Sequence, residues 1–215
     1  MELIILLIPL IPLAGAAFNL FFGRRVDGGH HDGHDEHPAG LSVAGLIACA
    51  MVGAAFVLSL MVFGQVLNGS RFNVDYFDWI TAGDFRVTLG FLVDPLTATM
   101  LLVVTGIGFL IHVYSLGYMG HDPDRPRFFT YLNLFIFSML MLVMGNNLVV
   151  MFFGWEAVGL CSYLLIGFFY KKKSAGDAGK KAFIVNRIGD FGFGLGIFLV
   201  YSTFGTIHFD QLFAA

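Results

Sequence analysis

Charge is scarce in this sequence of 215 residues. Only 13% of the residues are Asp, Glu, Lys or Arg, whereas a soluble globular domain carries about 25%. Apolar residues make up 57% of the chain, above the roughly 45–50% that is typical of soluble domains. This composition argues against a string of soluble domains. It predicts an all-α polytopic membrane protein built as a single membrane domain.

Cysteine and the common catalytic motifs are also scarce or missing. The two cysteines, Cys49 and Cys161, both lie in apolar runs, so we expect buried thiols and no disulfide or metal framework. The sequence contains no Walker A motif, no zinc-ligand spacing, no nucleophile elbow and no dinucleotide-binding fingerprint. Soluble-enzyme chemistry therefore has no support, and we expect no nucleic-acid partner.

Long apolar runs take the place of these features. Six of them are long enough, or nearly so, to cross about 30 Å of hydrocarbon as a helix. Pro9 and Pro12 predict a kink in the first run, and Asp94 followed by Pro95 predicts the start of the third helix. Gly192 and Gly196 give the last run a small-residue face for close helix contact. The predicted spans are residues 3–22, 41–66, 94–118, 128–144, 148–170 and 182–201.

Residues 71–92 follow a different pattern. Apolar and polar side chains alternate along two stretches, with Gly83 between them as the turn residue. This alternation predicts a β-hairpin outside the hydrocarbon. Tyr76 and Trp79 suit a position at the membrane interface.

Positive charge gathers in alternate loops between the predicted spans. Six spans in alternation place Arg24 and Arg25, Arg125 and Arg127, and residues 171–181 on one side. Short loops rich in Lys and Arg are typically cytoplasmic. We therefore expect the N-terminus and the hairpin to be periplasmic, in a protein of the bacterial inner membrane.

A cytoplasmic loop at residues 26–40 is rich in histidine, acidic residues and glycine. Clustered histidines among acids are able to ligate a transition metal. The density of glycine equally fits a solvated, flexible loop that holds no metal. The candidate ligands are His30, His31, His34 and His37.

Three ionisable residues lie well inside the predicted spans: Glu156 on the fifth, and Arg187 and Asp190 on the sixth. A charge at bilayer depth costs at least about 2.5 kcal/mol, and such residues by default mark ion or proton paths. Arg187 and Asp190 are three residues apart, so they share a helix face and can form an ion pair. Such a pair would also fit a role in helix packing alone.

The predicted span ends place these groups at different depths. At about 1.5 Å per residue, Glu156 lies roughly 21 Å and Asp190 roughly 13 Å from the cytoplasmic ends of their helices. We therefore expect no direct contact between the two carboxylates, although a water-filled gap could connect them. His112, near one end of the third span, is either a hydrogen-bonded interfacial residue or a weaker proton-path candidate.

Five segments together resemble one protein family in order and spacing. They resemble the N-terminal part of subunit L of the proton-translocating NADH–quinone oxidoreductase (respiratory complex I), which is subunit 5 in mitochondria. The resemblance covers nearly the whole chain except the histidine-rich loop. The segments are residues 91–97 (FLVDPLT), 112–119 (HVYSLGYM), 127–133 (RFFTYLN), 154–167 (GWEAVGLCSYLLIG) and 181–190 (KAFIVNRIGD).

The resemblance implies an antiporter-like subunit of the membrane arm. The family's proton-path glutamate on the fifth helix maps onto Glu156, and its Arg and Asp of the sixth helix map onto Arg187 and Asp190. The chain itself would carry no redox centre and no cofactor. NADH, flavin, iron–sulfur clusters and quinone would bind other subunits, and the partners would be the other membrane-arm subunits and the lipid bilayer.

The family's full subunit is much longer, and continues with a lysine on a seventh helix and a long lateral helix. We therefore expect this chain to be part of such a subunit. Two alternatives stay open. One is the large subunit of an Mrp-type Na⁺/H⁺ antiporter or of an inorganic-carbon uptake system, which shares the same helices. The other is a structural role in which the buried charges only lock the bundle.

Overall fold

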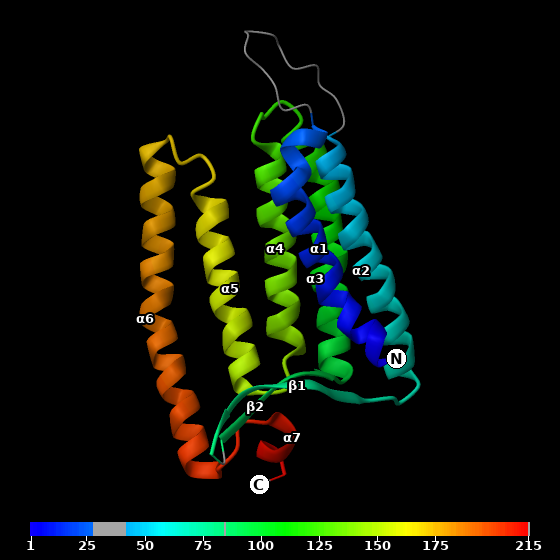
Figure 1. The fold of residues 1–215 in the computed structure, drawn as a ribbon, viewed down its shortest axis with the longest axis vertical. Helices are drawn as coiled ribbons and strands as arrows, with labels where there is room; N and C mark the ends of the chain where they lie inside the picture. The colour runs from blue at the N-terminus through cyan, green and yellow to red at the C-terminus, as the bar shows by residue number, and fades with distance from the viewer. Residues whose placement is uncertain (28–41, 84, 215) are drawn as a thin grey trace.

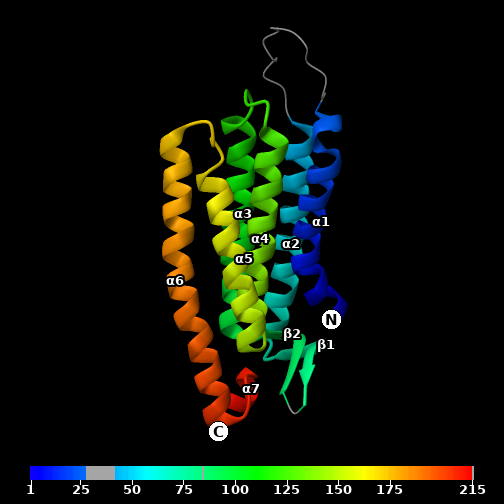
Figure 2. The same cartoon turned by 60° about the vertical axis from the view of Figure 1, so that its left-hand side comes forward.

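The structure, a computed structural model, describes residues 1–27, 42–83 and 85–214. Within these residues, six long helices run side by side and a two-stranded hairpin lies across one end of the bundle (Figures 1 and 2). All six are long and apolar enough to cross a membrane, as the apolar runs predict. They are α1 (Glu2–Val26), α2 (Val43–Leu67), α3 (Pro95–Tyr118), α4 (Arg125–Met144), α5 (Leu148–Ile166) and α6 (Lys173–Phe204).

The last two helices differ from their predicted limits. Helix α5 ends at Ile166, before the predicted 170, and α6 begins at Lys173 instead of 182. Lysine is a good helix former, so the lysine-rich segment continues the helix beyond the apolar run. Hydropathy indicates where the chain enters hydrocarbon, and a helix can begin before that point, as α6 does. As a result, α6 extends past the loop end of α5 (Figure 1).

Side chains fix several helix starts. The Thr97 N–H donates to the Asp94 carboxylate over 2.8 Å at the start of α3, with Pro95 in the first turn. Ser42 caps α2 in the same way, since its hydroxyl accepts from the Gly45 N–H at 2.9 Å. The start signal read from the sequence at Asp94 is therefore the one the fold uses.

The hairpin pairs β1 (Phe72–Ala82) with β2 (Phe85–Val93) in antiparallel register. Gly83 has a φ of +62°, a conformation that glycine adopts without steric cost. Two register shifts in β1 bend the ribbon, because an extra residue in one strand increases the local twist. After α6, Gly205 turns the chain into the short helix α7 (Phe209–Leu212), which lies beneath the hairpin (Figure 1).

The helices pack in a defined order. Helix α1 contacts α2 and α4, α2 contacts α3, and α4 contacts α5. Helix α6 packs chiefly against α5 and lies at the edge of the bundle (Figure 1). The core is therefore built mainly from α1 to α4, with apolar side chains such as Ile5, Ile8, Val52, Leu101 and Leu140 fully buried.

Close helix contact occurs at a different glycine from the predicted pair. Space is open around Gly192 and Gly196 on α6, where an added Cβ would meet no described atom within 4 Å. On α5, by contrast, a Cβ at Gly154 would overlap the backbone of Leu142 on α4. Gly154 therefore lets α4 and α5 approach closely, directly before Trp155 and Glu156.

Candidate functional site

Four side chains meet at the α5–α6 interface, away from both ends of the bundle. Trp155 and Glu156 come from α5, and Arg187 and Asp190 come from α6. Arg187 and Asp190 are three residues apart, so they point from the same face of α6. On the facing side of α5, Trp155 contacts Asp190 and the adjacent Glu156 contacts Arg187.

Arg187 lies between two carboxylates. Its Nη1 donates to Oε2 of Glu156, and the same nitrogen is 3.7 Å from Oδ2 of Asp190. The guanidinium also lies over the ring of Phe183, 4.8 Å from its centroid. One cation thus serves an acid on each helix, and its charge never titrates in a protein.

The two carboxylates have different surroundings. The Asp190 side chain is only 7% exposed, whereas that of Glu156 is 23% exposed and that of Arg187 is 47% exposed. Oδ1 of Asp190 accepts a hydrogen bond from the Trp155 indole nitrogen at 2.8 Å. Asp190 is therefore enclosed and doubly contacted, while the Glu156–Arg187 pair opens toward the outer face of the bundle.

The structure brings Glu156, Arg187 and Asp190 together, as candidates named from the sequence. The sequence did not predict that Arg187 would lie between the two acids, where it contacts Glu156 and is 3.7 Å from Asp190. The cause is the early start of α6: nine added residues move Asp190 about 14 Å further along its helix than the predicted span allowed. Sequence reasoning also missed Trp155, although a tryptophan beside an intramembrane acid is a residue whose N–H needs a partner.

His112 belongs to a separate polar pair. It is fully buried on α3, where Nδ1 lies 2.7 Å from the Gly108 carbonyl and Nε2 lies 2.8 Å from Oδ1 of Asn133 on α4. A carbonyl oxygen can only accept, so Nδ1 carries a proton. The hydrogen-bond partners of His112 are therefore separate from those of the Glu156 site.

Two further expectations concern possible metal or thiol chemistry. The histidine-rich loop, with His30, His31, His34 and His37, lies outside the described residues. Cys49 and Cys161 are buried free thiols, as expected, and the Cys161 sulfur is 3.6 Å from the Ser138 hydroxyl.

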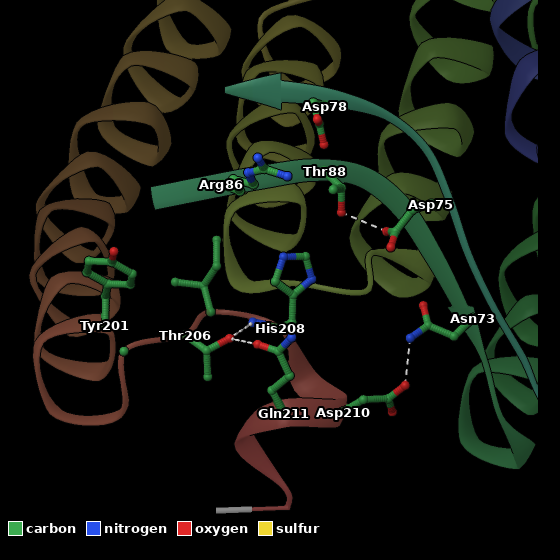
Figure 3. A pocket seen from close by; sticks show the side chains of 12 residues that line it. Asn73, Asp75, Asp78, Arg86, Thr88, Tyr201, Thr206, His208, Asp210 and Gln211 are labelled. Atoms are coloured by element: carbon green, nitrogen blue, oxygen red, sulfur yellow. Dashed lines mark hydrogen bonds between the residues drawn. The ribbon is translucent and has the colours of Figure 1, made fainter. Parts of the chain in front are cut away.

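A second polar region lies at the hairpin end of the bundle. A cavity of about 390 Å³ opens between the hairpin and residues 205–211 (Figure 3). Asp75 there accepts from the Thr88 hydroxyl at 2.6 Å, and Asp210 accepts from Asn73 at 2.6 Å and from Arg71 at 2.5 Å. These contacts tie the hairpin to the segment that follows α6.

Buried asparagines connect this region to α5. Asn146 donates to Oδ1 of Asp75 at 2.7 Å, and Oδ1 of Asn147 caps the first turn of α5 by accepting from Val149 and Val150. The turn between α4 and α5 is therefore held by the hairpin. This fixes the start of α5, about two turns before Glu156.

Two family models match the sequence. One is described as the N-terminus of NADH-ubiquinone oxidoreductase (complex I) chain 5 and matches residues 79–129. The other is described as the transmembrane part of NADH:quinone oxidoreductase and Mrp antiporter proteins, and it matches residues 145–215. The second match contains all four residues of the α5–α6 site.

Individual relatives agree with the models. NADH-quinone oxidoreductase subunit L of Mycobacterium tuberculosis is 47% identical over 95% of this chain and 31% of the relative. The chain thus spans about a third of the length of the curated relatives that it matches.

Two solved structures share the fold. A chain of the membrane-bound sulfane sulfur reductase, an archaeal respiratory membrane complex, superposes with a TM-score of 0.79 at 18% identity, covering 99% of this chain and 39% of that one. A chain of the Mrp complex from Dietzia sp. DQ12-45-1b superposes with a TM-score of 0.76 at 23% identity, covering 97% and 20%. The six helices and the hairpin therefore have a fold that also occurs in these two membrane complexes.

Proposed function

Because the chain belongs to the family of complex I subunit L and chain 5 proteins, we propose that it forms the N-terminal part of a proton-translocating, antiporter-like membrane subunit. The observation that carries the proposal is the position of Arg187, which contacts Glu156 on α5 and lies 3.7 Å from Asp190 on α6. One mobile cation between two acids is an arrangement that can respond to a single proton.

The response follows from the charges. An ionised Glu156 attracts Arg187, and burial strengthens this attraction relative to water. When Glu156 takes up a proton, the attraction is lost while the cation stays charged. Asp190 then offers the nearest ionised acceptor. The position of Arg187 therefore depends on whether Glu156 is protonated. When Arg187 returns to Glu156, its positive charge favours release of the proton from Glu156. His112 would be a weaker member of such a path.

The setting of this activity comes from the relatives' names. In a complex I, the subunit would couple proton movement to NADH oxidation and quinone reduction that take place on other subunits. We propose that this chain carries no redox centre, that its partners are other membrane-arm subunits, and that it lies in a bacterial inner membrane. The apolar outer faces of the helices would contact lipid.

A second function is favoured by a specific observation. The family model over residues 145–215 is shared by quinone oxidoreductases and Mrp antiporters, and the fold superposes on a chain of an Mrp complex. The alternative is therefore a subunit that exchanges Na⁺ for H⁺ without a redox partner. Identity favours the first function, since the relative at 47% is a quinone oxidoreductase subunit.

Glu156→Gln in the full-length subunit, assembled in its complex, tests the proposal. The amide of glutamine is always neutral, so its attraction for Arg187 cannot be switched by a proton. NADH-driven proton translocation into sealed membrane vesicles should therefore fall by about tenfold, within the usual range of coupling between two sites. Asp177→Asn, an exposed acid of the same α6 helix, is the matched control and should leave the rate unchanged.

Normal translocation by the Glu156→Gln complex, at normal subunit levels, would contradict the proton-path role. Asp190→Asn should give a milder loss, because Arg187 keeps Glu156 as its partner. If Asp190→Asn prevents assembly instead, the buried charges act in packing. Translocation that depends on Na⁺ and not on NADH would favour the antiporter alternative.

A further inference from the structure

Trp155 makes a polar contact that the proposed function does not yet use. Its indole N–H donates to Oδ1 of Asp190 over 2.8 Å, from α5 to α6. Asp190 is 5% exposed, so this donor supplies one of the few hydrogen bonds available to the carboxylate. A hydrogen bond to an ionised acceptor is among the stronger ones in proteins.

The two oxygens of Asp190 face different partners. Oδ1 accepts from Trp155, and Oδ2 faces Nη1 of Arg187 at 3.7 Å. An indole N–H can donate but not accept, and its bond to an ionised carboxylate is stronger than its bond to a protonated acid. The bond to Oδ1 also prevents rotation about the last side-chain torsion. Oδ2 is thereby kept pointing at Arg187.

The ring of Trp155 is itself held in place. It packs edge to face against Phe193 of α6, with centroids 6.0 Å apart, and Phe193 packs in turn against Phe152 at 5.3 Å. The charged groups described near Asp190 are Glu156 from α5 and Arg187 from its own helix. Trp155 is thus the neutral donor beside a group of three charges.

We propose that Trp155 is a positioning residue, which holds Asp190 as the second docking place for Arg187. When Arg187 leaves Glu156, it moves to an oxygen that Trp155 has already oriented. This inference rests on the proposed function, since it assigns Trp155 a part in the same exchange. It differs from a packing role, in which the indole only joins α5 to α6.

Trp155→Phe separates the two roles, because phenylalanine keeps an aromatic ring against Phe193 and removes only the N–H donor. In the full-length subunit within its complex, proton translocation per assembled complex should fall about threefold, and by no more than in Asp190→Asn. The pH–rate profile should also change, because the lost donor contacts an acid that takes part in the proposed exchange. Trp79→Phe, which keeps a ring beside Phe153 at the hairpin, is the control and should change neither.

A double-mutant cycle shows whether Trp155 acts through Asp190. In the Asp190→Asn background, Trp155→Phe should cause no further loss and no further change in the pH profile. If the two losses simply multiply, or if Trp155→Phe leaves the translocation rate and the profile unchanged, the inference is wrong. Should the phenylalanine variant assemble poorly, the sulfur isostere 3-benzothienylalanine at position 155 keeps the ring's size and lacks the donor, and the same results apply.

The two proposals fail in different ways. Normal translocation by the Glu156→Gln complex would contradict the proposed proton exchange, and with it the positioning role of Trp155. If translocation is reduced in the Glu156→Gln complex but normal in the Trp155→Phe complex, only the positioning role of Trp155 is contradicted.

Discussion

Arg187 stands between carboxylates from two helices, and its chemistry suits that position better than a lysine's would. A guanidinium stays charged under all conditions in a protein, and its fork of donors can contact two acceptors at once. A buried ion pair by itself stabilises a fold little, because desolvation offsets the attraction. The arrangement is therefore weak evidence for stability and fits the proposed movement of charge.

Tyr76 provides a residue-scale prediction outside the membrane spans. Burial, and to a lesser degree the negative charge of Glu2, raise the pKa of its phenol to about 12, and its hydroxyl donates to the Glu2 carbonyl at 3.0 Å. An unfolded chain loses this proton near pH 10, before the folded one does. The contribution to stability is therefore complete below pH 10 and is lost as the pH rises toward 12.

Tyr76→Phe should flatten this part of the stability profile. Thermal denaturation of the purified full-length subunit or complex between pH 9 and about 12 checks it, with Tyr118→Phe as the control because Tyr118 is 61% exposed. An equal fall of the denaturation temperature in wild type and Tyr76→Phe would refute the prediction.

At the scale of elements, two kinds of contact hold α5 in position: hydrogen bonds at its first turn and close packing against α4. Asn147 caps its first turn and is joined to β2 by a 2.8 Å hydrogen bond to the Thr88 carbonyl. Six residues before Glu156, Val150 is fully buried, and Gly154 allows the close approach to Leu142. Trp155 and Glu156 are thus presented to α6 by a helix that the rest of the bundle holds.

Gly154→Ala should disturb this presentation. The added methyl group would overlap the backbone of Leu142, which cannot rotate away as a side chain can, and overpacking of this kind costs about 1–3 kcal/mol. We expect reduced assembly or reduced proton translocation in membranes that carry the full-length variant. Gly159→Ala is the matched control on the same helix, because its Cβ would make only an ordinary contact of 3.9 Å with Asn186. Equal behaviour of the two variants would contradict the close-approach argument.

At the scale of the whole molecule, polar groups outside the α5–α6 site and the His112–Asn133 pair gather at the two ends of the bundle. One end carries the ion pairs Arg125–Asp27 at 3.1 Å and Arg127–Asp124 at 3.1 Å. The other end carries the hairpin and its asparagine and aspartate contacts (Figures 1 and 3). The loops that the sequence assigned to one side do lie at one end of the bundle.

Sidedness in the membrane is testable by labelling. We expect Asp78→Cys on the hairpin to react with a membrane-impermeant maleimide in intact spheroplasts, and Lys171→Cys to react only in inverted vesicles. The natural thiols Cys49 and Cys161 are buried and serve as the unreactive background. The opposite pattern would invert the predicted topology, with the N-terminus then cytoplasmic.

Much of this architecture was predictable because it follows from local patterns. The six runs, the hairpin with its turn at Gly83 and the helix start at Asp94 each depend on a few adjacent residues. Glu156, Arg187 and Asp190 were identifiable because charge is rare within apolar runs. Trp155 was not identifiable in this way, because its side chain is uncharged and its polar contact depends on Asp190 of another helix.

The sequence by itself determined that this chain crosses a membrane, where its helices lie and which charges they carry, since hydrophobicity and charge are properties of each residue. Only the tertiary structure decided which charges meet. The long α6 sets the depth at which Arg187 reaches Glu156, Gly154 sets the distance between α4 and α5, and Trp155 orients Asp190. These depend on the relative positions of separate helices, which no local pattern encodes.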